Sequence, residues 1–268
     1  MSDEPHIPGE FIEQVRKSAP AVLYKLEKLL HETPEGPLRG RVRSEIWDIR
    51  KALGGYTEYF SQAGQDAFLE NDIFTGMRNG VFVEIGAFDG IRGSNTLFFE
   101  KFRDWSGLLI EASPLYFSWL EQNRPHCARE RVAVAAEHGT SEFIEITEGA
   151  YMMSGVLETL APEHREAMKA GLYGKSHFIE VETQPLADIL RRHELDAIDF
   201  LSIDIEGGEF VALEHFPFDE FEIDVLAIEY YNDNENIDHD PTTELMRRNN
   251  YHLVGHFGAD QIWVSGTA

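Results

Sequence analysis

Val81-Phe-Val-Glu-Ile-Gly-Ala-Phe-Asp-Gly90 is the stretch that decides the fold. An apolar run rich in β-branched residues leads into a turn bounded by Gly86 and Gly90. Ser94-Asn95 then begin a helical pattern that ends near Phe102. A strand, a tight loop and a helix start, in this order, form the place where an α/β sheet binds the nucleoside part of a cofactor. The sequence therefore predicts a nucleoside-binding loop.

The charges of this loop indicate which cofactor it binds. A dinucleotide fingerprint spaces its glycines G-x-G-x-x-G at a helix N-terminus that meets a pyrophosphate. Here Glu84 takes the first position of that pattern and Asp89 lies inside the turn. Two carboxylates repel a pyrophosphate but attract an ammonium and a sulfonium. Glu111, which ends the next apolar run about 20 residues past the loop, can accept hydrogen bonds from ribose hydroxyls. These residues indicate an S-adenosylmethionine site.

Four blocks of the sequence resemble the FkbM-type methyltransferases, and their order is more specific than any one block. The blocks are Tyr59-Phe-Ser-Gln-Ala-Gly-Gln-Asp-Ala-Phe-Leu69, Phe82-Val-Glu-Ile-Gly-Ala-Phe-Asp-Gly90 with Ser94-Asn95-Thr96, Gly107-Leu-Leu-Ile-Glu111, and Leu201-Ser-Ile-Asp-Ile-Glu-Gly207. The resemblance covers roughly Tyr59 to Val264. It implies an α/β fold with a Rossmann-like, seven-stranded methyltransferase sheet.

Strand and helix patterns alternate from Val81 onward, which favours a parallel sheet with helices on both faces. The last two strands flank Phe257-Gly-Ala-Asp260 and are predicted to form a hairpin, so that the final strand is antiparallel. The strand candidates are Val81–Ile85, Leu108–Glu111, Arg131–Ala135, Phe143–Ile146, Phe178–Thr183, Phe200–Ile205, Val225–Tyr230, Tyr251–His256 and Gln261–Val264.

Residues 1–58 precede the first family block and are predicted to be a helical extension of a catalytic domain over residues 59–268. Apolar residues recur at helical spacing on both sides of the turn Thr33–Pro37, with Ser18 as an expected N-cap. The two stripes are Phe11, Val15, Val22, Leu23, Leu26 and Leu30, and Val42, Ile46, Ile49 and Leu53. Each stripe needs a cover, which the same chain, a cap over the active site or a second copy in a homo-oligomer can supply.

The segment Glu148–Lys175 has no clear period, apart from a short helical pattern over Pro162–Ala170. Irregular segments between strands often line a pocket. Two interpretations stay open, a lid on the substrate side of the site and a plain surface insertion.

The composition excludes several classes of partner. The 268 residues carry 23 Lys and Arg against 48 Asp and Glu, a net charge of −25, which repels nucleic acids and anionic membrane surfaces. Cys127 is the single cysteine, which excludes an internal disulfide and fits a reducing compartment. Neither a signal-like start nor a run of about 18 apolar residues occurs. We expect a cytoplasmic protein with a small-molecule or glycan acceptor.

Two acidic residues follow apolar runs that end at the carboxyl edge of the predicted sheet. Asp204 follows Phe200–Ile203, and Glu229 follows Val225–Ile228. With Asn232 they offer the oxygen ligands that Mg²⁺ prefers, and a bound metal would lower the pKa of an acceptor hydroxyl. Alternatively, the two carboxylates bind the ammonium of the cofactor or cap the helices that follow.

A general base is expected among Asp204, Glu206 and His256. Relatives often carry a histidine where this chain has Gly208, in the stretch Asp204-Ile-Glu-Gly-Gly-Glu209, so that base is missing. His215 and His256 could replace it, and His256, which stands at a strand end, is the better candidate. Asp204 and Glu206 could themselves withdraw the proton.

Further cofactor contacts are expected around the loop. The resemblance implies that the first of the four blocks lies against the cofactor and that Ser61, Gln62 and Gln65 reach its methionine carboxylate or amine. From the local pattern alone, Ser61 caps a helix and Gln65 lies near the capping-box position. Asn95 has the same two interpretations, cap or ligand contact, and Ser113, beside Glu111, is placed to edge the adenine. The predicted cofactor residues are Ser61, Gln65, Glu84, Gly86, Asp89, Gly90, Asn95, Glu111 and Ser113.

The sequence thus predicts an S-adenosylmethionine-dependent O-methyltransferase acting on a hydroxyl of a sugar, glycan or glycosylated natural product, with or without a metal. One alternative is a nicotinamide-dependent oxidoreductase, against which Asp89 and the glycine spacing count. The other is a non-catalytic scaffold that binds the cofactor, against which the acidic strand ends count.

Overall fold

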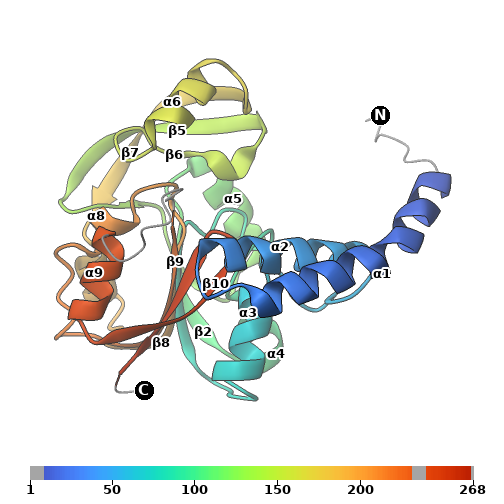
Figure 1. Ribbon diagram of the computed structural model, residues 1–268. Coiled ribbons are helices and arrows are strands. Elements are labelled where there is room, and N and C mark those ends of the chain that lie inside the picture. The colour runs from blue at the N-terminus through green and yellow to red at the C-terminus, as the bar shows by residue number, and fades with distance from the viewer. Residues whose placement is uncertain (1–8, 231–239, 267–268) are drawn as a thin grey trace.

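The computed structural model describes residues 9–230 and 240–266 of the chain (Figure 1). A seven-stranded sheet has the order β10-β11-β9-β8-β1-β2-β3. If the seven strands of this sheet are numbered 1 to 7 along the chain and the order is read from β3 to β10, it is 3-2-1-4-5-7-6. Its strands are β1 (Val81–Ile85), β2 (Ser106–Ile110), β3 (Ala128–Glu130), β8 (Ala197–Ile203), β9 (Glu222–Glu229), β10 (Tyr251–Phe257) and β11 (Asp260–Ser265).

The strand β1 lies inside this sheet, between β2 and β8, and pairs in parallel with both. The last strand, β11, is antiparallel to both β9 and β10, which confirms the predicted hairpin. Parallel strands must be covered on both faces, and β1 is buried from Phe82 to Ile85. Because β1, β2, β8 and β9 are parallel, their carboxyl ends meet at one edge of the sheet, where the predicted site residues lie.

Helices cover both faces of the seven-stranded sheet. On one face Val83 belongs to a core with Leu213 and Met246, and on the other Phe82 packs in a core with Phe99. Successive strand residues point to opposite faces, so the side chains of one continuous apolar run are buried alternately in the two cores. The covering helices are α7 (Leu186–Arg192), α8 (Glu209–Leu213) and α9 (Pro241–Arg248) on the first face, and η1 (Leu69–Ile73), α4 (Leu97–Arg103) and α5 (Pro114–Asn123) on the second, with α3 (Gln65–Phe68) leading into η1.

A second sheet, here called the cap sheet, has the order β4-β7-β5-β6. Figure 1 shows it with α6 at the top of the view, beyond the end of the main sheet. Its elements are β4 (Ala133–Val134), β5 (Gly139–Gly149), β6 (Gly155–Val156) and β7 (Gly174–Gln184), with η2 (Tyr151–Met153) and α6 (Pro162–Lys169) in the connection.

Three of the nine predicted strands belong to the cap sheet, and the sequence pattern did not separate them from the main sheet. The candidates Phe143–Ile146 and Phe178–Thr183 are parts of β5 and β7, whose long antiparallel pairing runs from Gly139 to Gly149. The main sheet reaches seven strands through β3, a three-residue strand that was not predicted. A strand this short has too few residues to show a period.

The first two helices are α1 (Gly9–Glu32) and α2 (Pro37–Ala52). The predicted N-cap at Ser18 is wrong, because α1 begins at Gly9 and continues through Pro20, whose ring is exposed. The helix α2 packs on β10: a Cβ atom added to Gly40 would lie 2.9 Å from the Cβ atom of His256. The same chain therefore covers Val42 and Ile46 of the predicted stripe, whereas Leu53 is exposed. The domain boundary at residue 58 stays a prediction.

The helix α1 packs on α2 and extends away from the sheets (Figure 1). Some of its large apolar side chains, Val22, Tyr24 and Leu29, are exposed. Among the described helices, none has the length and apolar composition needed to cross a bilayer.

Candidate active site

A cavity of about 380 Å³, here called the large cavity, lies between the carboxyl edge of the main sheet and the cap sheet. From the main sheet come Gly86, Glu111, Asp204 and Glu206, and Tyr151 comes from the connection within the cap. Ligands of open α/β sheets bind at this edge, and the volume is within the range of small-molecule sites. The sheet topology thus brings four of the predicted site residues to one cavity.

The loop after β1 passes very close to the end of β8. Gly86 has a φ of +80°, and a Cβ atom there would lie 1.7 Å from the carbonyl oxygen of Asp204. Gly90 has a φ of +77°, and its Cβ atom would lie 2.6 Å from side-chain atoms of Leu120 and Arg124. A glycine is required at both positions, because any side chain would strain the backbone and collide with its neighbours.

Glu84 holds the loop together from inside. Its carboxylate accepts hydrogen bonds from the Asn95 backbone N–H at 2.8 Å, from the Ser94 hydroxyl at 2.9 Å and from the Thr96 hydroxyl at 2.6 Å. Arg124, with no exposed side-chain area, lies 3.8 Å from the same carboxylate. Glu84 thus joins the end of β1 to the start of α4.

Arg124 is a residue that the sequence analysis missed. It forms an ion pair with Glu100 and donates to the Gly90 carbonyl oxygen at 3.0 Å. No sequence pattern marks it, because it lies at the C-terminal end of α5 and reaches the loop only through the fold.

Asp89 is also used within the loop. Its Oδ1 atom accepts from the backbone N–H groups of Ile91 and Arg92, at 2.9 and 2.8 Å. Its Oδ2 atom accepts from the Arg92 Nε–H at 2.7 Å. Asp89 is not among the residues that line the described cavities.

Glu111, directly after β2, does line the large cavity. It accepts backbone hydrogen bonds from Phe88 at 2.9 Å and from Ser113 at 2.7 Å. Burial raises the pKa of its carboxyl to about 7. Ser113 caps α5 and donates to Glu145 at 2.5 Å, which ties the end of β2 to the cap sheet.

Ser61 and Gln65 make contacts with the protein rather than with the large cavity. The Ser61 hydroxyl donates to Asp66 at 2.5 Å. The Gln65 amide donates to Asp260 Oδ2 at 2.7 Å, and its carbonyl oxygen accepts from the Ala63 N–H at 2.8 Å. Asp260, at the start of β11, was not predicted as a site residue; burial raises its pKa to about 6.

A smaller cavity of about 20 Å³ adjoins the large one, and both are lined by Gly86 and Asp204. Asn95 lines this small cavity, and its Nδ2 group donates to the Ser202 hydroxyl at 3.0 Å and to Asp260 at 3.4 Å. These two donations fix the orientation of the amide. The Asn95 Oδ1 atom is buried and has no hydrogen-bond partner in the described structure.

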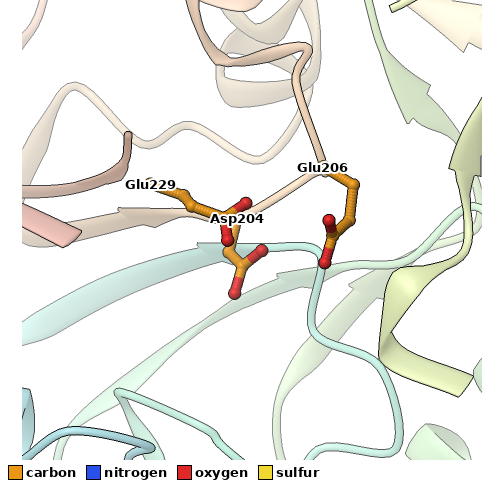
Figure 2. Close-up of side chains that lie close together, drawn as sticks. All are labelled: Asp204, Glu206 and Glu229. Carbon is orange, nitrogen blue, oxygen red and sulfur yellow. The ribbon is translucent and has the colours of Figure 1, made fainter. Parts of the chain in front are cut away.

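Three carboxylates meet at the ends of β8 and β9 (Figure 2). Asp204, Glu206 and Glu229 each place one oxygen within 4.8 Å of the others. Burial and the neighbouring carboxylates raise the pKa values of Asp204 and Glu229 well above the usual range. Oxygen ligands at this spacing suit a hard cation such as Mg²⁺. The third predicted ligand, Asn232, lies outside the described residues.

Glu206 is held in a constrained loop. It has a φ of +59°, a region that non-glycine residues rarely occupy. Glu209 holds this loop by accepting from the backbone N–H groups of Ile205 at 3.0 Å and Gly207 at 3.1 Å. Such conformations cluster at functional sites, and Glu206 lines the large cavity.

His256 lies beneath α2. Its backbone N–H donates to Glu35 at 2.8 Å, and its ring Nδ1 atom lies 3.4 Å from the same carboxylate. Burial raises the pKa of Glu35, but the hydrogen bonds from His256 and Arg43 outweigh burial and lower this pKa to about 2. His256 is not among the residues that line the described cavities. This position gives no support to a role as general base.

The strand order, the glycine loop and the acidic strand ends define a Rossmann-like fold of the methyltransferase type. The model of the methyltransferase FkbM domain matches residues 84–253, and the chain belongs to this family. A comparison with curated proteins gave no match.

Solved structures with a similar fold include a methyltransferase FkbM from Methylobacillus flagellatus KT, with 14% identity, a TM-score of 0.46 and coverage of 94% of this chain. The chain spans 60% of the length of that protein. An O-methyltransferase from Bacillus cereus, solved in complex with SAH, has 12% identity, a TM-score of 0.40 and coverage of 82% of this chain and 87% of its own.

Proposed function

We propose that the protein is an S-adenosylmethionine-dependent O-methyltransferase whose acceptor is a hydroxyl of a sugar, glycan or glycosylated natural product. The observation that carries the proposal is one cavity with Glu111 on one wall and the carboxylates of Asp204 and Glu206 on another. The first suits a ribose, and the others suit a reacting hydroxyl. Membership of the FkbM family supports the methyl transfer.

The residues of the two cavities fit S-adenosylmethionine. Glu111 keeps lone pairs free beside its two backbone donors, and these can accept from ribose hydroxyls. The unpartnered Asn95 Oδ1 atom is a buried acceptor, and leaving such a group unsatisfied is costly. The ammonium of the methionine part would satisfy it. Gly86 allows the cofactor to pass close to the backbone between these two contacts.

The acidic cluster supplies what the acceptor needs. Transfer from a sulfonium to an alcohol is an in-line displacement, and the hydroxyl must lose its proton. Glu206, buried on the cavity wall, is placed to accept that proton. Asp204, Glu206 and Glu229 would also hold Mg²⁺, which when bound lowers the pKa of the hydroxyl.

The acceptor would enter from the cap side. Tyr151, Met152 and Thr159 line the large cavity and come from the segment predicted as a lid or an insertion. Their position supports the lid interpretation, since they line the same cavity as Asp204 and Glu206. Acceptor choice would then depend on this segment.

The test is a methyl-transfer assay with S-adenosylmethionine and a panel of hydroxylated sugars and glycosides, in which mass spectrometry follows the release of S-adenosylhomocysteine. We expect turnover that EDTA removes and Mg²⁺ restores. Glu206→Gln should abolish turnover, whereas Glu121→Gln, on the exposed surface of α5, should not change it. Cofactor binding without turnover on any acceptor would favour a scaffold, and oxidation of an alcohol with NAD would favour an oxidoreductase.

A further inference from the structure

We propose that Arg92 binds the carboxylate of the methionine part of S-adenosylmethionine, an inference that rests on the proposed function. Arg92 lies in the loop between Gly90 and Ser94 and lines the small cavity beside Asn95 and Asp204. The two cavities share Ile85, Gly86, Phe88, Met152 and Asp204 on their walls. With adenosine in the large cavity, the amino-acid end of the cofactor therefore lies at the small one.

The charges around the two cavities leave this carboxylate a single strong partner. Among the described residues that line them, Arg92 is the only lysine or arginine. The acidic residues there are Glu84, Glu111, Glu137, Glu158, Asp204 and Glu206. A carboxylate brought into such surroundings is unfavourable unless a cation pairs with it.

The guanidinium of Arg92 is already positioned for this role. Its Nε–H donates to Asp89, and its central carbon lies 4.7 Å from the ring centroid of Phe88 and 5.7 Å from that of Tyr151. The two terminal nitrogens take part in no hydrogen bond of the described structure. A guanidinium fixed in one plane presents them as a fork that matches a carboxylate. Asp89 then acts on the cofactor through Arg92, as a positioning residue.

Of the residues expected from the sequence to reach the methionine part, Ser61 and Gln65 are engaged elsewhere. Ser61 donates to Asp66, and the Gln65 amide donates to Asp260. Asn95 presents an acceptor to the small cavity, which suits the ammonium and not the carboxylate. Arg92 is then the positively charged residue on the cavity walls that can bind the carboxylate.

The experiment compares two ligands that differ in the amino-acid part. S-Adenosylhomocysteine carries the carboxylate, and 5′-methylthioadenosine has the same nucleoside and sulfur without it. By titration calorimetry, Arg92→Met should weaken the binding of S-adenosylhomocysteine by about 10- to 100-fold, the range for charge-assisted hydrogen bonds. The affinity for 5′-methylthioadenosine should stay within about twofold. Arg92→Lys should fall between wild type and Arg92→Met.

The control is Arg78→Met, because Arg78 pairs with Asp104 on the surface, outside both cavities. It should change neither affinity. Equal losses for both ligands in Arg92→Met would show that Arg92 only supports the loop, and unchanged affinity for both would show that it has no role; either result overturns the inference. If the wild-type protein binds neither ligand, the proposed function fails and the inference with it.

Discussion

The carboxylates of the loop after β1 and those at the ends of β8 and β9 lie close together but differ in what surrounds them. Glu84 and Asp89 accept hydrogen bonds from backbone N–H groups, hydroxyls and arginine. Asp204 and Glu229 instead face each other and Glu206: they hydrogen-bond to each other, and burial and the neighbouring carboxylates raise the pKa of both. Buried charges without compensation are unfavourable for folding, and are retained where a site needs them. We therefore propose that the loop carboxylates build the site and that the strand-end carboxylates do its chemistry.

The largest effect that tests this contrast is on the rate. Asp204→Asn should lower turnover by about 10²- to 10⁴-fold, because it removes a carboxylate that would help to hold Mg²⁺ and so to withdraw the proton of the acceptor hydroxyl. The free energy of unfolding should not fall, because the substitution removes a repelling charge. Initial rates and urea denaturation of the same preparation measure both quantities. Turnover within tenfold of wild type would mean that Asp204 is dispensable.

The matching substitution in the loop should act on stability. Glu84→Gln removes the charge beside the fully buried Arg124 and should lower the free energy of unfolding by about 1–3 kcal/mol. Urea denaturation of Glu84→Gln, Asp204→Asn and the wild-type protein gives the comparison. If Asp204→Asn is less stable than Glu84→Gln, the proposed difference between the loop carboxylates and the strand-end carboxylates is wrong.

Cofactor affinity should depend on pH through Glu111. Its pKa is about 7 in the structure, and ribose hydroxyls that donate to the ionised carboxylate lower it in the complex. Binding then releases a proton below pH 7, so affinity should rise with pH up to about 7, by at most about tenfold per pH unit, and level off above. Calorimetry with S-adenosylhomocysteine from about pH 6 to pH 8.5 measures this. Glu111→Gln should remove the dependence of affinity on pH. If the affinity of this variant still rises with pH, another titrating group causes the rise.

The smallest effect is expected at Asp89. Asp89→Asn keeps an acceptor for the two loop N–H groups but loses the ion pair with Arg92, whose side chain is 54% exposed. Exposed pairs contribute little, so the affinity for S-adenosylhomocysteine should fall by no more than about fivefold. A hundredfold loss, measured in the same titration, would instead make Asp89 a direct cofactor ligand.

Local pattern predicted the centre of the fold well. The strand Val81–Ile85 and the final hairpin follow from periodicity and turn residues alone. The cap sheet could not be predicted in this way. The sequence patterns of β5 and β7 are those of ordinary strands, and neither pattern shows that the two segments pair with each other. Periodicity shows that a strand exists and does not show which sheet it joins.

The site was predicted only in part, for a similar reason. The strand-end residues Glu111, Asp204 and Glu206 line one cavity, and their roles there stay predictions. Whether a polar group is free for a ligand depends on partners elsewhere in the chain. The bond between Gln65 and Asp260 spans 195 residues. No spacing rule predicts such a contact.

The central claim is that this edge of the sheet receives an adenosine that carries an amino acid and no phosphate. Calorimetric titration of the wild-type protein with S-adenosylhomocysteine and, separately, with NADH tests it most directly. The account predicts saturable one-to-one binding of S-adenosylhomocysteine and no heat with NADH. Binding of NADH without binding of S-adenosylhomocysteine would contradict it.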